Sequence, residues 1–162
     1  MVSSGNGGEV GLQFSRIFDA PPELVFECFT QPEHLSHFWA PAGASAPAGR
    51  IRVDLRPGGT FATLIVNDTS GATYATDAVF LDVDRPSRLV WYERHTGMTV
   101  RVTFTALPSG KTLFRLHQTN VPDQVRLPEN QAGFKTTFEK FANYLSQLTH
   151  GEEHEHEHHD VR

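Results

Sequence analysis

Apolar and polar residues alternate with a period of two through the middle of the chain, a pattern that predicts β-strands. The clearest case is residues 99–106, where Val100, Val102 and Phe104 alternate with threonine and arginine. By this criterion we expect strands over residues 9–18, 50–55, 60–66, 73–83, 88–94, 99–106 and 112–119. Short turns rich in Gly, Pro, Asn and Asp separate the last six, so these strands should form an antiparallel meander.

Two short helices are expected after the first strand. Asp19 can cap the first helix, and Leu24, Val25, Cys28 and Phe29 recur at helical spacing within it. A second begins at Pro32 and ends near Trp39, before a loop rich in Ala, Gly and Pro over residues 40–49.

One long helix is expected at the end of the chain. Residues 121–130 read as polar and irregular, and beyond them apolar residues recur every three or four positions: Phe134, Phe138, Phe141, Leu145 and Leu148. This spacing predicts a helix with a broad aromatic face.

These elements predict an α+β fold in which a curved antiparallel sheet wraps around the C-terminal helix, because that helix alone is long enough to cover the meander. Alternation predicts these inward residues: Phe61, Thr63, Ile65, Val100, Val102, Phe104, Phe114, Leu116 and Gln118. Thr63 and Gln118 are polar members of apolar rows. They either orient a ligand in a pocket or lie at strand ends in contact with water.

Length and charge limit the classes of function. A chain of 162 residues fits one domain, over residues 9–150, with disordered tails at 1–8 and 151–162. The net charge is -5, and the second tail holds five acidic residues against one arginine, so the body is nearly neutral. A nearly neutral body lacks the basic surface that nucleic acid requires.

Other sequence-wide features point to a cytoplasmic protein. No apolar run is long enough for membrane insertion. The chain has one cysteine and no signal-peptide pattern at its start, which favours a reducing compartment.

Five segments form a recognisable set: residues 18–26, residues 32–41 with Phe38-Trp39, the Pro57-Gly58-Gly59 turn with its flanks, residues 82–90, and Gly133-Phe134. Together they resemble the START-like superfamily, in the branch named for the activator of the heat-shock protein 90 ATPase. The resemblance covers roughly residues 10–149. It implies a helix-grip fold and a hydrophobic pocket. Two positions depart from the pattern: Phe38 replaces the first of two tryptophans, and Gln118 stands where many members carry histidine.

Metal chemistry is suggested only by the tail, which contains His154, His156, His158 and His159 among acidic residues. Imidazole and carboxylate suit zinc or nickel, but a specific site needs ligands held in fixed geometry. We interpret the segment as a disordered native tail or a purification aid, with loose metal capture as the alternative. No cofactor and no specific metal site are expected.

Support for catalysis is thin, and no catalytic residue is assigned. Cys28 lies on an apolar helix stripe and is expected in the core. His34, His37, His95 and His117 are expected at the surface. Glu93, beside Trp91, is the one carboxylate that could be partly buried with a raised pKa, although exposure on an edge is the expectation.

The favoured hypothesis is non-enzymatic binding or carriage of a small hydrophobic or aromatic molecule in an internal cavity. The candidate ligand-binding residues are Phe38, Trp39, Phe61, Thr63, Trp91, Val102, Gln118, Phe134 and Phe138. Two alternatives stay open: an enzyme similar to polyketide cyclases and aromatases, which needs Glu93 or Gln118 to point inward, and a chaperone-interacting protein. A homodimer is also left open.

Overall fold

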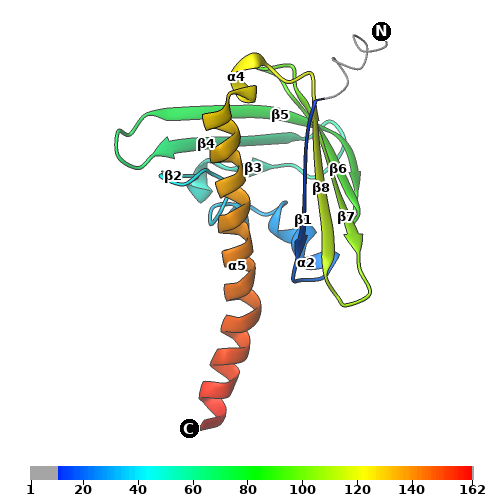
Figure 1. Ribbon diagram of the computed structural model, residues 1–162, viewed down its shortest axis with the longest axis vertical. Coiled ribbons are helices and arrows are strands. Elements are labelled where there is room, and N and C mark those ends of the chain that lie inside the picture. Colours follow the sequence, from blue (N-terminus) through cyan, green and yellow to red (C-terminus); the bar gives the residue numbers. More distant parts are fainter. Residues whose placement is uncertain (1–10, 162) are drawn as a thin grey trace.

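The computed structural model describes the backbone of residues 11–161 and the side chains as far as Thr149. Its strands are β1 (Leu12–Phe18), β2 (Ala44–Ser45), β3 (Arg52–Val53), β4 (Thr60–Asn67), β5 (Thr73–Asp84), β6 (Arg88–Glu93), β7 (Thr99–Ala106) and β8 (Thr112–Thr119). Its helices are α2 (Pro22–Cys28), α3 (Pro32–Leu35), the 3-10 turn η1 (Ala48–Arg50), α4 (Asp123–Arg126) and α5 (Pro128–Val161). Figure 1 shows α5 crossing one side of a curved sheet.

All strands belong to one antiparallel sheet with the order β1-β8-β7-β6-β5-β4-β2, and β3 also pairs with β4. The expected meander from β4 to β8 is confirmed, and β1 closes against the last strand, with Leu12 opposite Gln118. The sheet is curved but not closed, and with the long C-terminal helix it forms the expected helix-grip α+β fold.

The turn before β4 needs its two glycines. Gly58 has a φ of +85°, which residues with a side chain rarely adopt. A Cβ on Gly59 would lie 1.9 Å from the carbonyl oxygen of Asp54. This turn brings Asp54 and Thr60 into a backbone hydrogen bond of 2.8 Å and thereby starts β4.

Several predicted boundaries are wrong in detail. Only Arg52–Val53 of the strand expected over residues 50–55 pairs with β4, and the expected loop over 40–49 contains β2 and η1. The segment expected to be irregular, 121–130, contains α4 and the first turn of α5. Asp19 does not cap α2: Pro21 is the N-cap, and no side chain caps the helix, because a proline side chain has no hydrogen-bond acceptor.

The bounds of α5 run on through Val161, whereas the described side chains end at Thr149. The expected N-terminal tail, residues 1–8, lies outside the described residues. So do the side chains of the expected C-terminal tail, 151–162, and its disorder stays a prediction.

A cluster of aromatic rings fills the space between α5, α2, α3 and one end of the concave face of the sheet. We call it the aromatic end; its members are Phe18, Phe29, Phe38, Phe114, Phe138 and Phe141, all almost completely buried. Phe141 lies 4.4 Å from Phe38 and 4.7 Å from Phe18, measured between ring centroids. Edge-to-face and offset contacts of this kind stabilise a core beyond the burial of area alone. This end of the interior is solid.

Candidate functional site

The concave face of the sheet carries the expected inward residues. Strand register places Gln118 opposite Val100, Val100 opposite Trp91, and Trp91 opposite Phe80, so the four lie in one row across the sheet. Of the nine residues predicted to face inward, eight are buried and Ile65 is half-buried. The predicted register is therefore confirmed, including the inward position of Gln118.

Three candidate ligand-binding residues lie deep in the core. Phe38, Val102 and Phe138 are fully buried. The ring of Phe138 stacks on that of Phe14 at 4.5 Å, so α5 is fastened to β1 at this point. Other side chains already surround Phe38, Val102 and Phe138. These three residues therefore belong to the packed core.

Other apolar side chains on the same interior keep part of their surface accessible. Trp39 and Phe134 are half-buried, as are Leu12, Ile65 and Val125, and all five pack against the core cluster. Trp39 contacts Phe61 at 5.6 Å and Trp91 at 6.2 Å between ring centroids. These five side chains form an accessible apolar lining beside the solid aromatic end.

Lys140 of α5 fixes the loop that follows Trp39. Its Nζ donates to the carbonyl oxygens of Ala40, Pro41 and Ala44 at 2.9, 3.3 and 3.1 Å. Burial lowers the pKa of this ammonium group, and the negative charge of Asp68 opposes that shift. The lysine thus ties α5 to the segment that positions Trp39.

Polar side chains lie on the concave face at the opposite end of the strands from the aromatic end. We call this set the polar end; its members are Thr63, Tyr74, Thr76, Glu93 and Gln118, from strands β4, β5, β6 and β8. The hydroxyls of Thr63 and Thr76 share a hydrogen bond of 2.6 Å.

The side-chain amide of Gln118 has no hydrogen-bond partner in the described part of the chain. Gln118 is only 6% exposed, yet its side chain makes no hydrogen bond with another described residue. Within the described part of the chain, no fully enclosed side-chain nitrogen or oxygen lacks a partner. The amide must therefore border accessible space on the concave side, either in a pocket or near the end of β8.

Glu93 is half-buried on the concave face, opposite Ala78, and the expectation that it is exposed on an edge is wrong because β6 is a central strand. Burial raises the pKa of its carboxyl group, while hydrogen bonds from the side chains of Trp91 and Thr96 and the charge of His95 lower it. Burial also raises the pKa of Tyr74, and the negative charge of Glu93 adds to that shift. The charge of Glu93 therefore acts on the phenol of Tyr74 at this end.

The expectation that His34 and His37 are plain surface residues is incomplete, because both contact Tyr144 of α5. His34 Nδ1 and Tyr144 Oη share a hydrogen bond of 2.6 Å, and the His37 ring stacks on the tyrosine at 4.4 Å. The only signal for this partner was the position of Tyr144 one turn after Phe141.

Cys28 is buried as expected, and desolvation, reinforced by the charge of Glu27, raises the pKa of its thiol to about 12.

Neither a metal site nor a membrane span is found in the described part of the chain. There, no three His, Cys, Asp or Glu side chains are grouped so that they could hold a metal ion. The His-rich tail lies outside that search. No described helix combines the length and the apolar character needed to cross a membrane.

Solved structures of bacterial proteins share the fold. A protein from Nitrosomonas europaea is 29% identical, with a TM-score of 0.72, over 85% of this chain and 95% of its own. A protein from Chromobacterium violaceum is 24% identical over 82% of this chain and 94% of its own, and its TM-score is also 0.72. The AHSA1-like protein from Aeromonas hydrophila is 21% identical over 85% and 94%, with a TM-score of 0.69.

Sequence comparison assigns the family. No curated protein matches the chain. The family model described as "Activator of Hsp90 ATPase homolog 1-like protein" matches residues 19–146, which include the polar end and all of the aromatic end except Phe18. The chain belongs to this family.

Proposed function

We propose that the protein binds a small hydrophobic or aromatic molecule between the concave face of the sheet and the first half of α5. The observation that carries the proposal is the amide of Gln118, which borders accessible space among apolar neighbours without a hydrogen-bond partner among the described residues. Ligand sites combine an apolar lining with a few polar groups that orient the ligand, and this is the combination found here.

The accessible apolar lining would supply most of the binding free energy. Trp39 and Phe134 are the largest of its side chains, and each offers partly exposed ring surface. A ligand that covered them would bury apolar area at about 25 cal/mol per Å² before the costs of association. The Gln118 amide on β8 would orient a polar group of the ligand, whereas the hydroxyls of Thr63 and Thr76, which lie beyond β7 and β6, would contact a different part of it.

The proposed location is the cytoplasm, where the lone Cys28 would stay reduced. A ligand there would reach the site from solution.

Dye displacement tests the proposal. An environment-sensitive dye should bind saturably, and members of a panel of lipids and aromatic compounds should displace it. Thr63→Trp places an indole in the proposed site and should abolish dye binding, whereas Thr105→Trp, at an exposed position of β7, should leave it unchanged. Absence of binding across the panel, or equal binding by both variants, would contradict the proposal.

A second candidate is an enzyme similar to polyketide cyclases, favoured by one observation. Glu93 lies on the concave face with a raised pKa, beside Tyr74, so an acid–base group is available where a flexible substrate would be confined. If a poly-β-ketone analogue cyclises no faster with the protein than without it, or if Glu93→Gln reacts as the wild type does, this candidate is excluded.

A further inference from the structure

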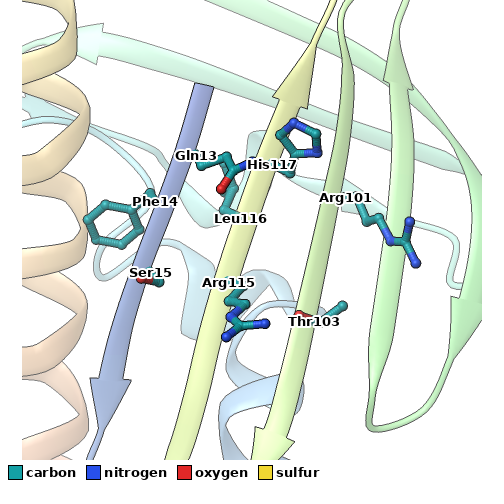
Figure 2. A pocket seen from close by; sticks show the side chains of 8 residues that line it. All are labelled: Gln13, Phe14, Ser15, Arg101, Thr103, Arg115, Leu116 and His117. Carbon is teal, nitrogen blue, oxygen red and sulfur yellow. The ribbon is translucent and has the colours of Figure 1, made fainter. Parts of the chain in front are cut away.

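A pocket lies on the convex face of the sheet, on the side opposite α5. It spans β1, β8 and β7 and has a volume of about 650 Å³. Figure 2 shows its polar side chains: Gln13, Ser15, Arg101, Thr103, Arg115 and His117. A volume of this size is within the range of small-molecule sites.

Strand register brings these side chains together. In one row across three strands, Gln13 lies opposite His117, and His117 opposite Arg101. In the next row, Ser15 lies opposite Arg115, and Arg115 opposite Thr103. Because successive residues of a strand point to opposite faces, all six lie on the face away from Phe14 and Leu116. Arg101 and Arg115 are diagonal neighbours on adjacent strands, a spacing of about 7–8 Å between Cα atoms.

The pocket has an excess of positive charge. No aspartate or glutamate is among its lining residues. Arg101 and Arg115 form no ion pair with any carboxylate among the described residues, and both are exposed. Their neighbour Arg88, in contrast, is paired with Asp82 at 2.6 Å, and Arg94 is paired with Asp77 at 2.9 Å. Two long cations therefore lie over one small area, with no carboxylate of residues 11–149 paired to either of them.

We propose that this pocket binds the phosphate group of a phosphate monoester through Arg101 and Arg115. Two guanidinium groups can each donate a pair of hydrogen bonds to phosphate oxygens. The hydroxyls of Ser15 and Thr103 and the amide of Gln13 supply further neutral donors at the rim. A dianion with three free oxygens uses this set more fully than a carboxylate does.

The rest of the molecule favours a small ligand over a polymer. Binding of a nucleic acid depends on many phosphate contacts at once. This pocket offers only two arginines for such contacts, and the net charge of the chain is -5, so a small ligand fits it better than a nucleic acid. The site also lies on the opposite face of the sheet from the proposed hydrophobic site, so the inference does not rest on that function.

Calorimetric titration with phenyl phosphate and with benzoate, at low salt, tests the proposal on the full chain. Phenyl phosphate should bind saturably and more tightly than benzoate. The double variant Arg101→Gln/Arg115→Gln should weaken it at least about tenfold, since two charge-assisted contacts are lost. Arg52→Gln is the matched control, an exposed arginine of β3 outside the pocket, and should bind as the wild type does.

A second arm distinguishes a free phosphate ester from a lipid headgroup. Phosphatidylcholine vesicles with and without phosphatidic acid are sedimented with the wild type and with the double variant. Loss of binding in the double variant in either arm supports the phosphate site and identifies its source. Absence of saturable binding in both arms, equal binding of benzoate, or wild-type binding by the double variant overturns it. Melting curves of the variants show that each is folded.

Discussion

The two ends of the concave face differ in what their side chains do. At the aromatic end, rings such as Phe138 and Phe141 are buried by contacts with other rings: Phe138 contacts Phe114, and Phe141 contacts Phe29. At the polar end, the amide of Gln118 and the ring of Tyr74, which is 55% exposed, remain accessible. One interior thus holds both a packed core and an accessible surface, because the buried aromatic residues of α5 cover only part of the sheet. Stability should depend on the first end and ligand binding on the second.

The largest expected effect comes from truncating a ring at each end. Phe141→Ala should lower the free energy of unfolding by about 3–5 kcal/mol, because it leaves a cavity in a solid core. Phe134→Ala, at a half-buried position of the same helix, should cost about 1–2 kcal/mol, in keeping with its partial burial. Urea denaturation of both variants measures the difference. Equal losses would mean that the two ends are packed alike.

Lys140 fastens α5 to the loop after Trp39 and should have an intermediate effect. Lys140→Met removes three hydrogen bonds to the carbonyls of residues 40–44 and should cost about 1–3 kcal/mol. It should also change the fluorescence of Trp39, which precedes that loop. Lys135→Met, at an exposed position of the same helix, is the control and should do neither. If Lys140→Met changed neither the free energy of unfolding nor the fluorescence of Trp39, other contacts would hold the loop.

Glu93 should give a smaller effect that depends on pH. Its folded-state pKa is raised above the ordinary 4.5, so the folded protein holds this proton more tightly than the unfolded chain does. The resulting stabilisation is complete below about pH 4.5 and is lost as the pH rises through the folded-state pKa. Glu93→Gln should therefore match the wild type at low pH and become relatively more stable toward neutral pH. Denaturation midpoints from pH 4 to 8 measure this trend, with the exposed Glu129→Gln as the control. A difference that is the same at every pH would argue against a buried carboxylate.

The smallest effect concerns Cys28. With a pKa of about 12 and full burial, its thiol should react with a disulfide reagent at neutral pH only when the chain unfolds. The labelling rate should therefore follow the global unfolding rate across urea concentrations. Fast labelling in the native state would show that α2 opens locally away from the aromatic end.

The sequence predicted the sheet better than it predicted the site. Alternation was sufficient to orient Thr63 and Gln118 correctly, since a buried face fixes the register of every strand. It could not find the β-bulge near Phe80 and Asp82, which leaves Leu81 52% exposed within an otherwise alternating strand. Nor could it find the Tyr144 contacts, because they join segments 110 residues apart.

The convex pocket escaped prediction for a similar reason. Arg101 and Arg115 occupy polar positions that are ordinary in each strand taken alone. Only the pairing of β7 with β8 makes them diagonal neighbours without a counter-charge. Single residues carry no signal for such a site, which arises from register alone.

The most direct test of a binding site at the polar end is an NMR titration of the isotope-labelled protein with a dye or ligand from the displacement panel. If the ligand binds there, the backbone signals of Thr63, Glu93 and Gln118 and those around Phe134 should shift saturably, and the signals around Phe141 should stay unchanged. Shifts confined to the convex face, or no saturable shifts at all, would contradict a binding site at the polar end.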